Sequence, residues 1–205
     1  DEQVQPLPDI NTIADYAFEG CQLTAFFNND TSFNTVQIIN HHAFDGALFS
    51  GIPSKNDFKM IGNIVFGVDD DAEKIEFPED TKYVLPTDID YKNVKRAVIR
   101  NIKNVNGINK LPETIVIADD KFAKNKMFEI YRYLNTTNVS CIEASKDSGF
   151  ASKDGILYSE NMKQLILCPA NKTGDVIIPE GVTCINDFAF YGARIDHISV
   201  FPEKH

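Results

Sequence analysis

The segment IPEGVTCINDFAFYG at residues 178–192 contains the pattern that decides the fold. The apolar-proline pair Ile178-Pro179 is followed by Ile185, which lies five residues before Phe190, and a glycine closes the segment. Proline has no N–H to give to a strand ladder, whereas glycine accepts the positive φ of a tight turn. A unit of this size has a single apolar side. It therefore predicts a repeat protein in which successive copies bury that side against one another.

The same spacing of isoleucine and phenylalanine occurs in four other parts of the chain. These copies are Ile13–Phe18, Ile39–Phe44, Ile61–Phe66 and Ile117–Phe122. In the first two of them a glycine follows the phenylalanine two residues later, as it does in the 178–192 segment. A worn copy is expected near residues 89–97. We therefore expect a linear stack of about six coils, in which isoleucine packs inward and phenylalanine fills the space between coils.

These residues resemble the BspA-like leucine-rich repeat family, whose unit joins apolar-x-apolar-Pro to Ile-x-x-x-Ala-Phe. The best copy is residues 178–192, and the next best is residues 7–23. The sequence FASKDGILY at residues 150–158 is similar to a hairpin found between such repeats, and it predicts a hairpin insertion at about 145–173. Asp-Gly is itself a strong hairpin turn signal. Residues 81–110 lack an Ala-Phe pair and are interpreted as degenerate repeats.

The resemblance implies an α/β repeat solenoid. Its members form a leucine-rich-repeat-like right-handed superhelix that is strand-rich, with short helical or irregular segments on the convex side. Residues 1–205 are expected to form a single solenoid of this type. The family also implies surface exposure or secretion in bacteria. We expect a secreted or cell-surface protein whose signal peptide has been removed, because the chain starts at Asp1 without methionine or an apolar leader.

The composition limits the classes of partner. The 20 Lys and Arg residues against 30 Asp and Glu residues give a net charge of −10, and no basic cluster is present. Nucleic-acid binding needs clustered cations, so it is not expected. No apolar run approaches the roughly 18 residues of a membrane-spanning helix, so no transmembrane segment is predicted. The 43% of hydrophobic residues is enough for a continuous core.

Four cysteines lie far apart in the sequence, at Cys21, Cys141, Cys168 and Cys184. Because no CxxC motif is present, neither a structural zinc site nor a thioredoxin-type redox pair is expected. The cysteines are interpreted as small buried apolar residues, with one disulfide as the alternative.

Two groups of side chains have the chemistry of metal ligands. His41 and His42 are adjacent imidazoles, but other copies carry unrelated residues at these places, so a variable surface position is favoured. The aspartates at 69–71 and Glu73 could offer oxygen ligands to calcium, yet the glycine and glutamate of an EF-hand are missing at their offsets. A solvated acidic turn is favoured there, and no metal or other cofactor is expected.

The densest aromatic run, MFEIYRYL at residues 127–134, is the first expected place of a binding patch. In a strand, Tyr131 and Tyr133 lie on the face opposite Phe128 and Ile130, where they would be available for recognition. A helix, or a strand buried on both sides, is an equally open alternative.

The sequence has no nucleophile elbow, HExxH motif, phosphate loop or dinucleotide fingerprint. We expect a non-catalytic binding or adhesion module that recognises a protein or glycan on a host or neighbouring cell surface through the solenoid face. No catalytic, metal-binding or cofactor-binding residue is assigned, and the binding residues and oligomeric state are left open. The alternatives are a structural spacer within a larger surface protein and a hydrolase with converging carboxylates or a Cys–His pair.

Overall fold

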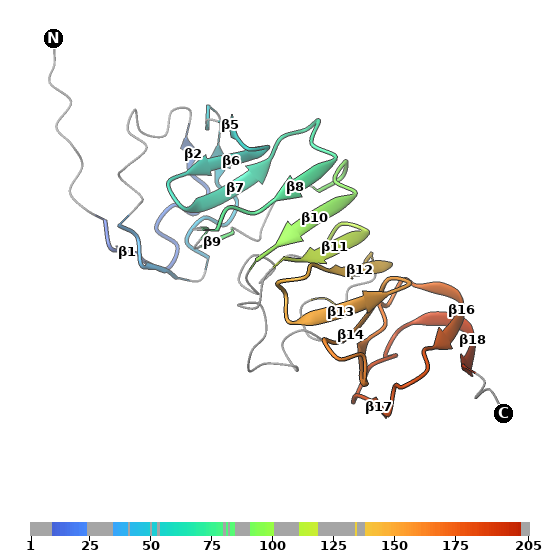
Figure 1. Cartoon of the computed structure of the whole chain (residues 1–205). Coiled ribbons are helices and arrows are strands. Elements are labelled where there is room, and N and C mark those ends of the chain that lie inside the picture. The colour runs from blue at the N-terminus through green and yellow to red at the C-terminus, as the bar shows by residue number, and fades with distance from the viewer. Residues whose placement is uncertain are drawn as a thin grey trace, which may run out of the picture. The chain divides into compact units, whose positions relative to one another are not determined.

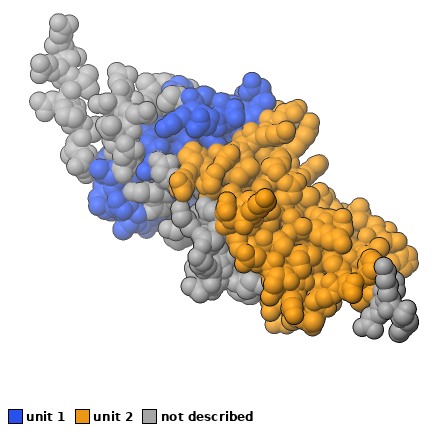
Figure 2. Space-filling model, in the orientation of Figure 1, with its two compact units in different colours: residues 1–72, 80–90 blue, residues 73–79, 91–205 orange. Residues whose placement is uncertain are grey.

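A computed structural model describes residues 10–23, 35–40, 42–49, 51–52, 54–79, 81, 83–84, 91–100, 111–118, 134 and 138–201. The chain divides into two compact units, residues 1–72 with 80–90 and residues 73–79 with 91–205 (Figure 2). Strands and tight turns make up most of the described residues, and Leu134 is the one helical residue among them. Each unit is built from short strands that stack along the chain (Figure 1).

The first unit begins with two coils that stack in register. Their parallel pairs are β1 (Thr12–Ile13) with β3 (Ile38–Ile39), and β2 (Gln22–Leu23) with β4 (Leu48–Phe49). Ile13 lies opposite Ile39 in this ladder. Because both isoleucines hold the same place in the sequence pattern, the pairing confirms that the first two copies are structural repeats.

A tight corner follows the isoleucine of each of these coils. The residue before alanine, Tyr16 or His42, has a φ of 58°, and a glycine closes each corner with a φ of 64° or 63°. The Phe18 N–H donates to the Ala43 carbonyl of the next coil at 2.7 Å. The Phe18 ring stacks on that of Phe44 with centroids 5.1 Å apart. The phenylalanine therefore fills the space between coils, as the pattern predicts.

An antiparallel meander takes the place of the expected third copy. Its strands are β5 (Ser54–Lys55), β6 (Phe58–Ile61) and β7 (Ile64–Val68), and β9 (Tyr83–Val84) joins β7 in parallel. Ile61 lies opposite Ile64 across the hairpin, so the interpretation of Ile61–Phe66 as a repeat corner is wrong. Val65 stands where the corner has alanine, and a β-branched residue favours an extended strand over a tight turn.

The second unit contains a parallel ladder of four strands. They are β8 (Lys74–Glu76), β10 (Arg96–Ile99), β11 (Thr114–Ile117) and β12 (Cys141–Ala144), which lie side by side in Figure 1. One buried row crosses all four strands: Ile75, Ala97, Ile115 and Ile142. β10 belongs to the stretch 81–110, and its register shows that residues 96–99 keep the ladder geometry.

The ladder also corrects the Ile117–Phe122 copy. Ile117 pairs with Ile99 inside the parallel ladder, on a strand of the apolar-x-apolar type rather than at a corner. Lys121 stands in place of the corner alanine, and no glycine follows two residues after Phe122, so the sequence lacks what the corner needs. Phe122 itself lies outside the described residues.

The hairpin insertion expected at about 145–173 is present. Its strands are β13 (Phe150–Lys153), β14 (Ile156–Ser159) and β15 (Gln164–Leu167), and β17 (Cys184–Ile185) joins β15 in parallel. The turn residues Asp154 and Gly155 have φ of 53° and 76°, the pair of positive angles typical of a type I′ turn. The last parallel pair is β16 (Thr173–Ile178) with β18 (Arg194–Val200).

Each unit has its own apolar cluster between its strands. The cluster of the first unit consists of Ile13, Val36, Ala43, Phe44, Ala47, Ile61 and Ile64. The cluster at the hairpin of the second unit consists of Ile156, Tyr158, Leu165, Cys168, Val176, Ile178 and Ala189. The expected fold class is confirmed as a strand-rich repeat solenoid of the leucine-rich-repeat kind, with turns and irregular segments joining its short strands.

Candidate interaction face

The candidate site is the outer face of the four-strand ladder in the second unit. Side chains alternate between the two faces of a strand, so the residues between the buried ones point away from the core. Two register rows hold them: Lys74, Arg96, Thr114 and Cys141 in one, and Glu76, Val98, Val116 and Glu143 in the other. We refer to these eight residues as the outer ladder face.

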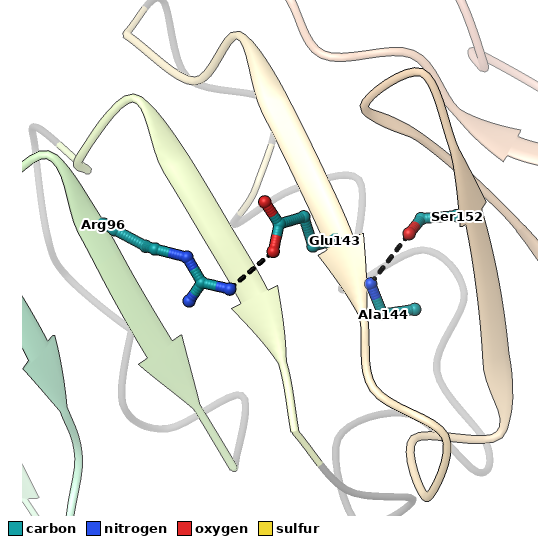
Figure 3. Close-up of polar contacts among 4 residues, drawn as sticks. All are labelled: Arg96, Glu143, Ala144 and Ser152. Atoms are coloured by element: carbon teal, nitrogen blue, oxygen red, sulfur yellow. Dashed lines mark hydrogen bonds and ion pairs between the residues drawn. The ribbon is translucent and has the colours of Figure 1, made fainter.

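An ion pair crosses the outer ladder face over one intervening strand. The Arg96 guanidinium on β10 lies 2.5 Å from the Glu143 carboxylate on β12, and it reaches that carboxylate across β11 (Figure 3). The two side chains are 34% and 44% exposed. A partly exposed pair of this kind adds roughly 0–1 kcal/mol to stability. Its consequence for recognition is that both head groups are held in fixed positions on the face.

Two valines lie between the charged ends of one row. Val98 on β10 and Val116 on β11 are neighbours, with Glu76 on one side and Glu143 on the other. Arg100 pairs with Glu76 at the β8 side. Val98 is half-buried and Val116 is buried, so the apolar centre of the row is largely covered and its charged ends are the more exposed part. An apolar centre with a charged rim is the common anatomy of a protein-binding surface.

The hairpin insertion closes the far edge of this ladder. The Ala144 N–H donates to Ser152 Oγ at 3.0 Å (Figure 3), and the Ile142 N–H donates to the Gly155 carbonyl at 2.9 Å. These bonds use two backbone donors of β12 that an open strand edge would leave unpaired. At this end the face therefore offers side chains to a partner, because the backbone donors are already engaged.

Cys141 is the thiol among the eight residues of the outer ladder face. Burial raises the pKa of this thiol, and the Glu143 carboxylate raises it further. Because the thiolate is the nucleophilic form of cysteine, a raised pKa keeps Cys141 unreactive near neutral pH. The face is thus suited to non-covalent contact at this position.

All four cysteines are free thiols, so the disulfide alternative is not observed. The expected burial holds for Cys168, where desolvation raises the pKa of the thiol to about 11. The expectation of burial is wrong for Cys184, which is exposed. Cys21 and Cys141 are half-buried. Cys184 is exposed because it lies on the short strand β17, both of whose residues face solvent.

Of the two adjacent histidines, His42 lies within the described residues. His41 lies outside the described residues, and His42 Nδ1 lies 2.5 Å from Asp45 Oδ2. The hydrogen bond to Asp45 raises the pKa of His42, and the charge of the same carboxylate adds to this effect. Within the described ranges, no three His, Cys, Asp or Glu side chains gather as the ligands of a metal ion would.

The carboxylates of the acidic turn have separate partners. Asp69 Oδ1 accepts a hydrogen bond from a serine hydroxyl at 2.5 Å, and Asp70 Oδ1 lies 3.9 Å from Lys59 Nζ. In the second unit, Glu73 Oε1 accepts from Lys95 Nζ at 3.2 Å. These contacts fit the interpretation of a solvated acidic turn.

The aromatic run at 127–134 lies outside the described residues except for Leu134, which is buried. The binding patch expected there stays a prediction. Binding through the solenoid face was expected, but the residues of the outer ladder face were not predicted, since Arg96 and Glu143 are 47 residues apart and no local motif joins them. The available signal was the pair of short apolar runs at 97–99 and 115–117, which lie in register on neighbouring strands.

A comparison with protein families identifies the repeat. A model of the BspA type leucine-rich repeat region matches residues 4–111 in six copies, a little over half of the chain. The chain belongs to the BspA-type leucine-rich repeat family. The match includes residues 81–110, so the degenerate stretch is part of the repeat region of this BspA-type protein. No curated protein matches the chain.

Two solved structures are similar to this BspA-type repeat chain. The pneumococcal vaccine antigen PcpA is 14% identical, with 93% of this chain and 50% of that chain covered and a TM-score of 0.46. A leucine-rich repeat protein from Eubacterium ventriosum is 14% identical, with 87% and 53% covered and a TM-score of 0.38. The chain spans about half the length of either protein. Among the described residues, no helix is both long and apolar enough to cross a membrane.

Proposed function

We propose that this chain is a non-catalytic binding module of the cell surface or extracellular space that recognises a protein or glycan through the outer ladder face. The observation that carries the proposal is the row from Glu76 to Glu143, in which the half-buried Val98 and the buried Val116 lie between charged side chains. A parallel ladder holds such side chains at fixed spacing, which lowers the entropy lost when a partner binds. The proposed mechanism needs no cofactor.

The proposed location and extent rest on the family. Resemblance to BspA-like proteins implies bacterial surface exposure or secretion, and we extend this to the present chain. The partner would then lie on a host or neighbouring cell. We also propose that residues 1–205 form one solenoid, in which both units contribute coils of the same repeat type.

The test measures partner binding by charge-reversal variants on an array of matrix proteins and glycans. Arg96→Glu and Glu143→Arg each leave two like charges on the face. The double variant R96E/E143R restores a pair of opposite polarity and leaves the net charge unchanged. We expect all three to lose at least about tenfold in affinity for the partner that the wild type binds, equivalent to about 1.4 kcal/mol.

The matched control is Lys59→Glu, which makes the same charge change as Arg96→Glu but lies in the first unit. It should keep wild-type affinity. Unfolding curves show whether each variant is folded before its binding is compared. Full binding by the double variant would contradict a role for the outer ladder face, and an array on which the wild type binds nothing would favour the spacer alternative.

A further inference from the structure

A stacked pair of aromatic rings lies at the corners of the first two coils. Tyr16 and His42 hold the same place in the repeat, and their ring centroids are 5.2 Å apart with planes within 7° of parallel. Tyr16 keeps 56% of its surface exposed although one ring face lies against His42. The exposed part of the phenol ring is therefore on the side turned away from His42.

The backbone at these corners does not favour aromatic side chains. Tyr16, His42 and Phe188, which holds the same place in the C-terminal copy, all have a φ of 58°. Glycine adopts this left-handed conformation without strain, and asparagine or aspartate tolerates it better than other residues do. The three described corners nonetheless carry rings. Strained residues that persist in a fold are typical of functional positions.

Carboxylates accompany the exposed ring. Asp15 and Glu19 are exposed and lie close to Tyr16 in sequence. The hydrogen bond that His42 donates to Asp45 is the main cause of the raised pKa of His42, and the charges of Asp15 and Glu19 raise that pKa further. Asp45 pairs with His42 at 2.5 Å, so the remaining local charge is negative.

The same combination recurs in the second unit. Asp187 precedes Phe188 as Asp15 precedes Tyr16, and both residues of the later pair are exposed, with 57% of Phe188 accessible. The pairing of a left-handed aromatic residue with an exposed carboxylate is therefore present in the first and the last described corner.

We propose that the Tyr16–His42 stack, together with Asp15 and Glu19, binds a lysine or arginine side chain of a basic polypeptide segment. The face of an aromatic ring attracts a cation, and nearby carboxylates provide an opposite charge. The net charge of −10 adds long-range attraction for a basic partner. This surface belongs to the first unit and the outer ladder face to the second, so the two proposals are independent.

The experiment uses the full chain and labelled octa-arginine, with a Gly-Ser peptide of equal length as the neutral probe. Fluorescence anisotropy at low ionic strength gives the dissociation constants. The wild type should bind octa-arginine and not the neutral peptide. Tyr16→Phe keeps the ring and should stay within about twofold of wild type, whereas Tyr16→Leu and Asp15→Asn should each weaken binding by about three- to fivefold.

Asp71→Asn is the matched control, because it removes the same charge from the exposed acidic turn and should change affinity by less than about twofold. Equal weakening by Asp15→Asn and Asp71→Asn would mean attraction by net charge alone. If Tyr16→Leu bound octa-arginine with wild-type affinity, the Tyr16 ring would not contribute to binding. If the wild type did not bind octa-arginine, or bound the Gly-Ser peptide equally well, the site would not be selective for a cation. Each of these results overturns the proposal. Circular dichroism verifies that the variants are folded.

Discussion

Two antiparallel meanders, residues 54–68 in the first unit and 150–167 in the second, have the same strand order but different surroundings. In each, three strands pair antiparallel and the third receives a parallel partner. The middle strand β14 is buried at three successive residues, whereas β6 has the half-exposed Lys59 where β14 has the buried Leu157. The same strand arrangement is therefore covered on both faces in the second meander, whereas one face of the first meander is partly exposed to solvent.

The largest effect is expected from truncating these equivalent side chains. Leu157→Ala should lower the free energy of unfolding by about 2–5 kcal/mol, because it removes a fully buried side chain and leaves a cavity. Lys59→Ala should change it by about 0.5 kcal/mol or less, since 41% of that side chain is exposed. Urea unfolding followed by circular dichroism measures both. Equal losses would show that the first meander is covered on both faces as well.

The sequence predicted one meander and missed the other because their turns differ in chemistry. Asp154-Gly155 is a strong signal for a two-residue turn, whereas Asn56-Asp57 is a weaker one, although both residues there also have positive φ, at 52° and 68°. The missed segment also matched the spacing of isoleucine and phenylalanine. The three copies that adopt the corner all have alanine before phenylalanine and glycine two residues later, so those small residues identify the corner.

The Asp154-Gly155 turn of the second meander should tolerate substitution much less than the Asn56-Asp57 turn of the first meander. A Cβ on Gly155 would lie 3.1 Å from Cys141 Sγ and 3.2 Å from Cys141 Cα, at a φ of +76°. Gly155→Ala should therefore cost about 2–4 kcal/mol, from left-handed strain together with the tight contact against backbone. Thermal and urea unfolding measure the loss. Asp57→Ala, at the equivalent place, is the comparison and should cost about 1 kcal/mol or less. A neutral Gly155→Ala would mean that β12 and the hairpin are not in close contact.

The Asn56-Asp57 turn of the first meander should become more stable when its second residue is glycine, as it is in the Asp154-Gly155 turn. Asp57 has a φ of 68°, so Asp57→Gly relieves left-handed strain and creates the favoured Asn-Gly turn. The entropy that glycine loses on folding offsets part of this gain, so we expect a net stabilisation of about 0.5 kcal/mol. A rise in the urea midpoint at unchanged slope would be the positive result. A fall in the midpoint would show that the Asp57 side chain makes a stabilising contact.

The outer ladder face shows where prediction from sequence ends. The short apolar runs at 97–99 and 115–117 are typical of buried strands, and parallel stacking was implied by the repeat. The contact of Arg96 with Glu143 depends on the strand order, which no motif in the sequence fixes. The Tyr16–His42 stack depends in the same way on the register of two coils. A site whose side chains are brought together by strand register can therefore be identified only from the three-dimensional structure, even when the repeat itself is recognisable in the sequence.

The smallest expected effect is a pH dependence that belongs to the second meander alone. Burial raises the pKa of Tyr158 from about 10 to about 12, whereas the equivalent residue of the first meander, Met60, does not titrate. The folded state holds this proton more tightly than the unfolded state, so its contribution to stability is complete below pH about 10 and is lost as the pH rises to about 12. Wild type should therefore lose stability more steeply than Tyr158→Phe over this window.

Urea midpoints measured across that pH range, together with tyrosinate absorbance, test this difference. Burial also raises the pKa of Tyr91, so the difference between wild type and Tyr158→Phe is needed to isolate one phenol. Tyr191→Phe, which removes an exposed hydroxyl, is the matched control and should follow the wild-type curve. If Tyr158→Phe followed that curve too, the phenol would titrate alike in the folded and unfolded states. In that case the middle strand β14 of the second meander would be as accessible to solvent as the face of β6 that carries Lys59.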